Sequence, residues 1–245
     1  MSELLGDIRD YWTMRAEGYS CSVNNSIETG QSEFWLKMIS KYIDLDRPLR
    51  ILDVGTGPGF FPMLLGHMNH SITAVDYTES MLNAARDNCK KSNVCATLLQ
   101  MDAQNLEFDD ESFDLVISRN LVWDLEHPVK AYKEWMRVLT HDGKMIIFDG
   151  NHYLHLFDEK YENTGDDKSY KSEYMMGVDT NIMQNIAKEL PLSKERRPQW
   201  DAVKLMEMGT SNVSIYTDPA KSIHISEYGE DLILPVSFMI CATKI

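Results

Sequence analysis

The chain has 245 residues, 43% of them hydrophobic, which suits one α/β domain with an insertion and a single sizeable core. Its formal net charge of −14 disfavours a nucleic-acid substrate and an anionic membrane surface, because both require a basic face. Nothing resembles an apolar membrane span of about 18 residues, and the four cysteines lack the short spacing of a zinc site. We therefore expect no nucleic-acid or membrane partner. Free thiols and the lack of a signal-peptide pattern favour the cytoplasm.

The first 48 residues read as a helical cap in front of the domain core. Apolar and aromatic residues recur at helical spacing from Ile8 to Tyr19, and a second helix is expected over about residues 32–42. The polar stretch 20–26 between them predicts a loop.

A buried strand beginning at Leu49 runs directly into a glycine-rich turn. Asp53 lies near the end of the strand, and Gly55, Gly57 and Gly59 follow at alternate positions. Glycine places no Cβ in the way, so a ligand can lie against bare backbone there. The free N–H groups at the start of the next helix are expected to point at that ligand.

The spacing separates this turn from two other nucleotide-binding turns. A dinucleotide fingerprint needs a glycine where Phe60 stands, and a P-loop needs a Gly-Lys-Ser/Thr that does not follow. A purely structural turn is the alternative for so short a pattern, so the neighbouring segments must decide.

Three further strands are expected, and two of them carry an acid at the end. Asp76 ends residues 71–76, Asp102 lies near the end of residues 96–103, and Arg119 ends residues 112–119. Because parallel strands present their carboxyl ends at one edge of a sheet, these side chains should lie near Asp53. The other expected elements are helices over 79–86 and 131–139, a turn at 141–144 and a fifth strand beginning at 145–148.

As a set, these elements resemble the class I S-adenosylmethionine-dependent methyltransferases over about residues 49–150. Residues 134–143 match that family's pattern E-x-x-R-V-L-x-x-G-G, although His141-Asp142 replaces the usual Pro-Gly in a surface turn. The resemblance implies an α/β fold with a doubly wound, seven-stranded, mostly parallel Rossmann-like sheet. Its last strand would be antiparallel, and helices from the N-terminus and from an insertion after the fifth strand would cap it.

The resemblance also implies how S-adenosyl-L-methionine would bind. Asp53 and the glycine turn would hold the amino-acid end, Asp76 the ribose, and Asp102 the adenine amino group. Carboxylates repel a pyrophosphate, so this set suits a phosphate-free sulfonium compound better than a dinucleotide. The cofactor-binding residues expected are Asp53, Gly55, Thr56, Gly57, Gly59, Asp76, Tyr77, Met81, Asp102, Ala103, Gln104 and Arg119. Plain core packing is the alternative for Met81, and a surface position is the alternative for Arg119.

The first helix carries Tyr11-Trp12-x-x-Arg15-Ala16-x-x-Tyr19, which resembles the N-terminal helix of small-molecule methyltransferases. In that group the tyrosines cover the cofactor, so Tyr11 and Tyr19 join the cofactor-binding set. An aromatic face attracts a sulfonium by about 0.5–2 kcal/mol. The alternative is that Trp12 and Tyr19 only anchor the helix.

Residues 151–198 are expected to form a lid over the substrate, including a helix near 181–190 and a charged run over 158–171. Trp123, Asn151 and Tyr153 are the predicted substrate contacts, and His152 is the weak candidate for a catalytic base. His152 and His155 could begin a metal site, but no third ligand is spaced near them, so no metal is expected. The dense basic run 194–197 is interpreted as a solvated helix end.

Residues 199–245 should complete the core sheet. A helix over 199–208 would turn Trp200, Val203 and either Leu205 or Met206 inward. Strands over 213–216 and 232–243 would form a closing hairpin.

These observations predict a methyltransferase that moves a methyl group from S-adenosyl-L-methionine to a small-molecule acceptor, leaving S-adenosyl-L-homocysteine. A non-catalytic module that binds the cofactor for regulation is the alternative, and an NAD-dependent oxidoreductase is the less favoured one. The acceptor atom and the oligomeric state stay open.

Overall fold

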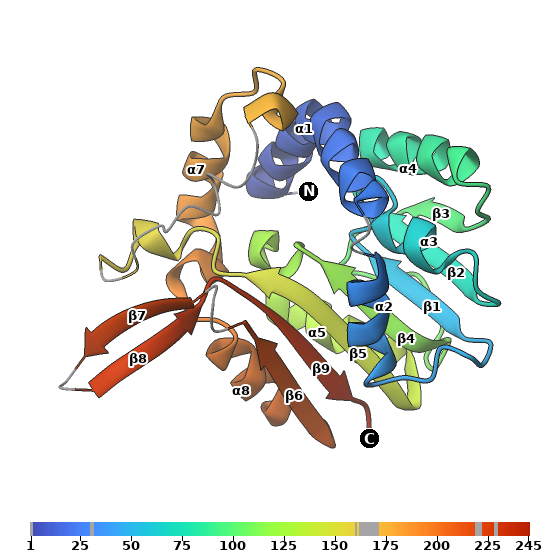
Figure 1. The fold of residues 1–245 in the computed structure, drawn as a ribbon. Helices are drawn as coiled ribbons and strands as arrows, with labels where there is room; N and C mark the ends of the chain where they lie inside the picture. The colour runs from blue at the N-terminus through green and yellow to red at the C-terminus, as the bar shows by residue number, and fades with distance from the viewer. Residues whose placement is uncertain (1, 30–31, 160, 162–171, 219–221, 228–229) are drawn as a thin grey trace.

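The computed structural model describes residues 2–29, 32–159, 161, 172–218, 222–227 and 230–245. At its centre lies a seven-stranded sheet of order β3-β2-β1-β4-β5-β9-β6 (Figure 1). Its strands are β1 (Arg50–Val54), β2 (Ser71–Asp76), β3 (Thr97–Gln100), β4 (Phe113–Arg119), β5 (Leu139–Gly150), β6 (Asn212–Thr217) and β9 (Ser237–Thr243). β1 to β5 are parallel to one another, whereas β9 is antiparallel to both β5 and β6. The predicted doubly wound sheet with an antiparallel last strand is confirmed.

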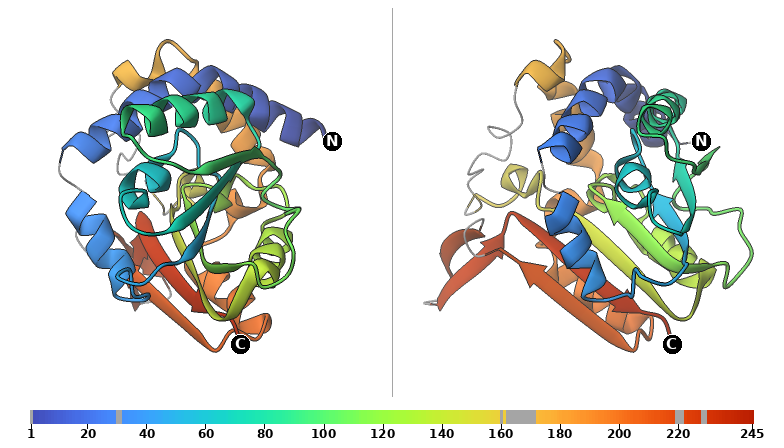
Figure 2. Two further views of the ribbon diagram at one scale, coloured as in Figure 1. Left: turned by 90° about the vertical axis from the view of Figure 1, so that its right-hand side faces the viewer. Right: turned by 45° about the vertical axis from the view of Figure 1, so that its right-hand side comes forward.

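Helices cover both faces of the sheet. They are α1 (Glu3–Glu28), α2 (Ser32–Ser40), α3 (Phe60–Leu65), α4 (Glu79–Lys91), α5 (Pro128–Val138), α7 (Thr180–Glu189) and α8 (Gln199–Glu207). Within the described ranges there are also four short 3-10 turns, η1 (Val122–Asp124), η2 (Leu154–Leu156), η3 (Ser172–Met175) and η4 (Pro191–Lys194). α5 and α8 pack on one face, and α2 and α3 pack on the other (Figures 1 and 2).

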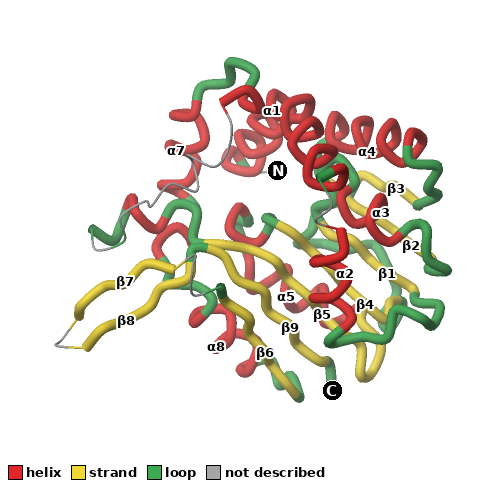
Figure 3. Tube along the Cα trace, in the orientation of Figure 1, coloured by secondary structure: helices red, strands yellow, loops and turns green. Residues whose placement is uncertain are grey.

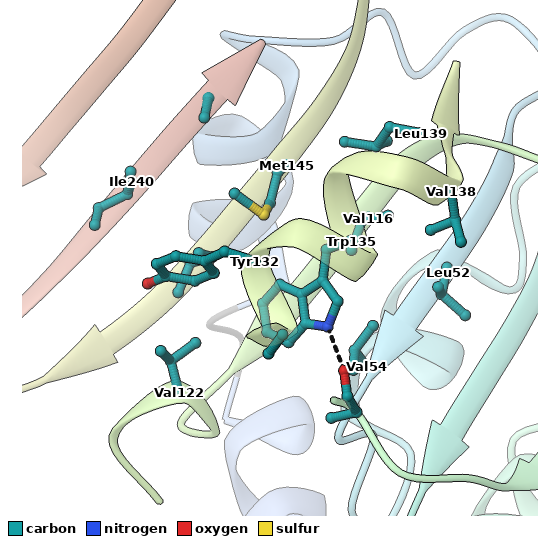
Figure 4. Packing of buried hydrophobic residues seen from close by; sticks show 14 of the residues in the cluster. Leu52, Val54, Val116, Val122, Tyr132, Trp135, Val138, Leu139, Met145 and Ile240 are labelled. Atoms are coloured by element: carbon teal, nitrogen blue, oxygen red, sulfur yellow. Dashed lines mark hydrogen bonds between the residues drawn. The ribbon is translucent and has the colours of Figure 1, made fainter. Parts of the chain in front are cut away.

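Side chains that alternate along the strands contribute to two separate hydrophobic cores, one on each face of the sheet. In β4, Leu115 and Ile117 face the α2–α3 side, whereas Val116 between them faces α5. Trp135 of α5 is fully buried on that second side, and its indole N–H donates to the carbonyl oxygen of Ala103 at 2.9 Å (dashed line in Figure 4). The same helix that fills the core therefore also fixes the loop after β3.

α1 is one continuous helix of 26 residues, so the loop predicted at residues 20–26 is wrong. Several polar side chains of that stretch form hydrogen bonds without breaking the helix. Ser26 donates to the carbonyl oxygen of Ser22, and Asn24 donates to the side chain of Asn88 on α4. Val23 is buried among them, so packing against the core outweighs the loop preference of serine and asparagine.

The segment predicted as a single strand over 232–243 is two strands. β8 (Glu230–Pro235) pairs with β7 (Ser222–Glu227) in a separate two-stranded sheet that projects from the body (Figure 1), and β9 begins after Val236. β6 and β9 do lie side by side, but this projecting sheet connects them instead of a tight hairpin.

Two smaller expectations also need correction. The turn predicted at 141–144 is an irregular beginning of β5, where Asp142 takes a positive φ of 61°. In α8, Val203 and Met206 are 48% and 59% exposed, while Asp201 takes a fully buried position beside Leu205.

The interpretation of residues 194–197 as a solvated helix end is wrong for Arg197, which is fully buried next to the buried Asp201. Its guanidinium pairs with Asp149 and with Asp201, both at 2.9 Å, and the hydroxyl of Tyr132 also donates to Asp201. Arg196, its neighbour, pairs instead with the partly exposed Asp158 at 2.7 Å. Residues 162–171 of the charged run lie outside the described residues.

Candidate functional site

A cleft of about 940 Å³, part of it open to solvent, lies at the carboxyl ends of β1, β2, β3 and β4. α1 passes over these strand ends (Figure 3), and its residues Trp12 and Tyr19 line one side of the cleft. In an open α/β sheet this is where ligands bind, at the point where the strand order reverses between β1 and β4. The lining residues used below are Trp12, Tyr19, Asp53, Gly55, Thr56, Gly57, Asp76, Tyr77, Met81, Asp102, Ala103, Gln104, Arg119, Asn120, Leu121 and Asp124.

The turn after β1 needs its glycines for two different reasons. Gly55, Gly57 and Gly59 all have positive φ, at 68°, 53° and 89°. A Cβ on Gly55 would also stand 2.6 Å from a methyl carbon of Leu121, whereas one on Gly57 would stand 3.5 Å from the Tyr19 ring. Gly55 therefore allows close packing within the protein, and Gly57 keeps space between the turn and α1.

The amide groups of the turn itself are engaged within the protein. The N–H groups of Gly55 and Thr56 both donate to the carbonyl oxygen of Val75, and that of Gly59 donates to Thr56. The N–H of Gly57 donates to the carboxylate of Asp76 at 2.8 Å. These four amides are used inside the protein, so the turn offers close approach to a ligand rather than these donors.

Two buried acids dominate the electrostatics of the cleft. Asp53 is 1% exposed and Asp124 is 4% exposed. Oδ2 of Asp53 and Oδ1 of Asp124 accept no hydrogen bond from any described residue. Burial raises the pKa of Asp53 to about 7 and that of Asp124 to about 8, because a desolvated carboxylate is disfavoured. A cation placed between such acids would meet unsatisfied acceptors.

Asp124 is held by the helix above it. The other carboxyl oxygen of Asp124 accepts the indole N–H of Trp12. The Trp12 ring in turn contacts Tyr11 and Tyr19 edge-on, at 5.3 and 5.4 Å between ring centroids. The aromatic residues of α1 therefore form one connected group, of which Trp12 and Tyr19 line the cleft.

Asp76 has a different environment from the other two acids. Its two oxygens accept the N–H groups of Gly57 and Thr78, each at 2.8 Å. Burial raises its pKa to about 6, and these hydrogen bonds oppose that rise. The carboxyl group is thus fixed at the end of β2, with lone pairs left to accept hydroxyl groups.

The corner after β3 is tied together by side chains. Oδ1 of Asp102 accepts the backbone N–H of Gln104 at 2.8 Å. The side-chain oxygen of Gln104 accepts the N–H of His127 at 2.6 Å, and Ala103 is held by Trp135 as described. This network fixes Asp102, Ala103 and Gln104 along one wall of the cleft.

The structure brings most of the predicted cofactor residues onto this cleft but leaves some outside it. Tyr11 and Gly59 do not line it: Tyr11 packs with residues of α7, and Gly59 packs on Ala85. Trp123 and Tyr153 stack at 5.3 Å between ring centroids, also outside the lining. Asn151 is buried and bonds the backbone of Arg197 and Pro235, which is a structural role.

His152 lies beside the buried network rather than in the cleft. Its Nε2 is 3.6 Å from Oδ1 of Asp149, and its ring lies 5.1 Å from that of Trp123.

Within the described residues, no cluster of three or more histidine, cysteine or acidic side chains could hold a metal ion. In the same part of the chain, no helix combines the length and apolarity needed to cross a membrane.

The sequence reasoning missed Asp124, Asn120 and Leu121 and treated Trp12 only as an anchor. Asp124 follows β4 by five residues, on the 3-10 turn η1, rather than standing at a strand end. The sequence does contain a signal for these residues. Trp123 and Asp124 lie within five residues of the end of a strand expected to border the cofactor, in the run Asn120–Asp124.

Comparison with known proteins points to one family. Residues 52–147 match the family model of a methyltransferase domain. A phosphatidylethanolamine N-methyltransferase of Cereibacter sphaeroides is 34% identical over 106 residues, which cover 42% of this chain and 51% of that protein. A ubiquinone/menaquinone biosynthesis C-methyltransferase UbiE of Citrifermentans bemidjiense is 30% identical over 132 residues, covering 52% and 56%. The chain therefore spans little more than half the length of these curated relatives.

Solved structures agree on the fold. A putative methyltransferase of Bacillus halodurans superposes with a TM-score of 0.59 at 19% identity, covering 85% of this chain and 97% of that one. A SAM-dependent methyltransferase of Aquifex aeolicus gives a TM-score of 0.56 at 17% identity, covering 92% and 98%. Residues 52–147 are therefore similar to a methyltransferase domain, and the strand order and the glycine turn of this chain agree with that similarity.

Proposed function

We propose that the protein transfers a methyl group from S-adenosyl-L-methionine to a small-molecule acceptor by in-line displacement. One observation carries the proposal: Asp53 and Asp124 are buried at the cleft, and each has an oxygen without a hydrogen bond among the described residues. A cationic, phosphate-free ligand is stabilised by the ionised forms of both acids, whereas a pyrophosphate is repelled by those forms and by ionised Asp76. The residues present therefore fit this cofactor.

The side chains divide the binding task along the strand ends. Asp53 and Asp124 would hold the cationic amino-acid end, Asp76 the ribose hydroxyls, and the corner of Asp102 and Ala103 the adenine. When bound, the cofactor supplies a methyl group activated by a sulfonium. The contribution of the protein is alignment, which can lower a barrier by about 7–11 kcal/mol.

We propose that the outer segments cover this core. Residues 1–48 would form the cap, 49–150 the cofactor-binding core, 151–198 the substrate lid, and 199–245 the completion of the sheet. The packing of α1 against α7 through Ile8, Tyr11, Met183 and Ile186 supports the idea that cap and lid act together.

A general base is required only if the acceptor is protonated at neutral pH. His152 is the candidate, because the buried carboxylate of Asp149 lies 3.6 Å from its Nε2 and could orient its ring. The absence of His152 from the cleft lining weighs against direct contact with a reacting atom.

Parallel calorimetric titrations with S-adenosyl-L-methionine and with NAD test the proposal. We expect binding of the first at micromolar concentration and none of the second. Incubation with a metabolite library should then yield a methylated product and S-adenosyl-L-homocysteine. Binding without turnover on any acceptor would favour a regulatory module, and binding of NAD alone would favour an oxidoreductase.

A further inference from the structure

A second cleft adjoins the first at the carboxyl end of β4. It encloses about 820 Å³, part of it open to solvent, and among the described residues it shares only Arg119 and Asn120 with the first cleft. Its walls come from α2, the carboxyl ends of β5 and β6, and the beginning of β9. The first cleft thus lies at the β1–β3 half of the sheet edge, and the second cleft lies at the half formed by β5, β9 and β6.

Aromatic rings and methionine side chains make up most of the lining of the second cleft. Five of its residues carry rings, namely Phe34, Trp35, Phe148, Tyr216 and Phe238, and Met38 and Met239 add polarizable thioethers. Trp35 and Phe148 meet edge-on with ring centroids 4.7 Å apart. Rings arranged in this way favour a flat, unsaturated guest that can stack or meet them edge-on.

Three charged residues of the described chain line this cleft, namely Arg119, Asp149 and Asp218, and the following contacts engage the first two. Asp149 accepts from Arg197 at 2.9 Å and from the backbone N–H of Trp123 at 3.1 Å. The guanidinium of Arg119 lies over the rings of Trp35 and Phe60, at 5.2 and 4.4 Å from their centroids, and forms the wall between the two clefts. These contacts make the interior suitable for an uncharged ring.

Asn120 provides a polar group at the junction of the two clefts. Its backbone takes a positive φ of 53° and is held there, because its N–H donates to Phe148 and its carbonyl oxygen accepts from the Trp123 indole. Its side-chain amide forms no hydrogen bond with any described residue, although it lines both clefts. A strained position held by surrounding structure, with a free amide at a junction, is typical of a ligand-orienting residue.

We propose that the second cleft is the acceptor site and takes an aromatic ring bearing an O–H or N–H nucleophile, which the Asn120 side chain orients toward the first cleft. The inference rests on the proposed methyl transfer. A lone pair of the acceptor oxygen or nitrogen forms the bond to the methyl carbon. The carbon–sulfur bond breaks, its electron pair stays on sulfur as a neutral thioether, and the acceptor proton goes to solvent.

The test combines an acceptor screen with variants that leave the cofactor cleft intact. Phenols and anilines are compared with aliphatic alcohols and amines of similar size, by mass detection of the methylated product. Phe34→Ala and Tyr216→Ala remove rings that line only the second cleft and are 53% and 38% exposed, so folding should survive. Phe157→Ala is the matched control, because its ring is 44% exposed and lines neither cleft.

We expect the aromatic acceptors to be preferred at least tenfold in kcat/KM. Phe34→Ala and Tyr216→Ala should each raise the acceptor KM about five- to tenfold with the cofactor Kd unchanged, while Phe157→Ala matches the wild type. Asn120→Gly keeps the positive φ and removes the amide, so it should lower kcat on the aromatic acceptor at least tenfold.

Preference for aliphatic acceptors, or unchanged kinetics in Phe34→Ala and Tyr216→Ala, would overturn this assignment of the acceptor site. The proposed methyl transfer would stand in that case, because the wild type would still bind the cofactor and turn over. Absence of cofactor binding in the wild type would instead remove the proposed function itself, and the acceptor site with it.

Discussion

Trp12 of α1 donates its indole N–H to the buried carboxyl group of Asp124, which follows β4 on η1. This contact ties the helix above the cleft to the segment beside the strand end. It also leaves the second oxygen of Asp124 without a hydrogen bond among the described residues, in a cleft that already contains Asp53 and Asp76. Closure of the cleft and provision of an acceptor for a cation therefore depend on the same pair of residues.

Replacing Asp124 with Asn should weaken cofactor binding about 10- to 100-fold, because a hydrogen bond to a charged group contributes about 1.5–3 kcal/mol. The amide oxygen can still accept from Trp12, so the position of α1 should be retained. Calorimetric titration with S-adenosyl-L-methionine measures the change. Asp142→Asn is the control, since that side chain is 78% exposed. Equal affinity of Asp124→Asn and the wild type would contradict a role for this charge.

The affinity for a cationic cofactor should rise with pH. Burial raises the pKa of Asp76 to about 6, of Asp53 to about 7 and of Asp124 to about 8, so the free protein retains protons that a cation must displace. Binding should strengthen between about pH 6 and pH 8.5 and release protons at pH 7. Calorimetry in two buffers with different heats of ionisation detects this release. Binding without proton release would show that these acids do not face the cation.

The same shifts predict the opposite trend for the stability of the free protein. In the unfolded chain these carboxyl groups titrate near their usual value of 3.8, so between about pH 4 and pH 8 the folded state holds more protons. The free energy of unfolding should therefore fall as pH rises through this range. Urea denaturation at fixed pH values measures it, and Asp124→Asn should flatten the upper part of the curve.

Gly55→Ala should destabilise the protein by about 2–4 kcal/mol. Its positive φ is unfavourable for alanine, at about 1 kcal/mol, and the new Cβ would stand 2.6 Å from Leu121, which must shift. Gly209→Ala is the matched control, because Gly209 has a φ of 77° with no atom within 4 Å of the added Cβ. Chemical denaturation of both variants separates the cost of the positive φ from the cost of the close contact with Leu121. Equal losses in the two would mean that Leu121 adapts without cost.

Arg197→Met should cost about 3–5 kcal/mol, because it leaves Asp149 and Asp201 buried without their partner. Burial alone would raise the pKa of Asp149, but Arg197 holds it below its usual value of 3.8. Wild-type Asp149 therefore adds stability above that pH, and this contribution is lost as the pH falls below it. Arg196→Met is the control, since its partly exposed pair with Asp158 is expected to contribute below about 1 kcal/mol. Urea denaturation at neutral pH compares the two.

The parts of the fold that depend on local pattern could be predicted from the sequence. β1, β2 and β4 are apolar runs with clear ends, and parallel pairing brings Asp53, Asp76 and Asp102 to one cleft. These acids come together because the carboxyl ends of neighbouring strands meet, which needs no knowledge of side-chain packing.

The parts that depend on distant partners could not be predicted in this way. The continuity of α1 needs Asn88 from α4, and the burial of Arg197 needs Asp149 from β5 and Asp201 from α8. The second cleft is assembled from α2, β4, β5, β6 and β9, which are separated by up to about two hundred residues of sequence. No short window contains the signal for any of these three features.

The insertion of β9 between β5 and β6 has a consequence for the order in which the chain matures during translation. β6 pairs with no strand except β9 in the described sheet, so it stays outside the sheet until the ribosome has released Ser237–Thr243. The strands that carry Asp53, Asp76 and Asp102 are complete long before that point. All described residues that line the first cleft, Asp124 included, are therefore synthesised before the strands β6 and β9 that complete the second cleft.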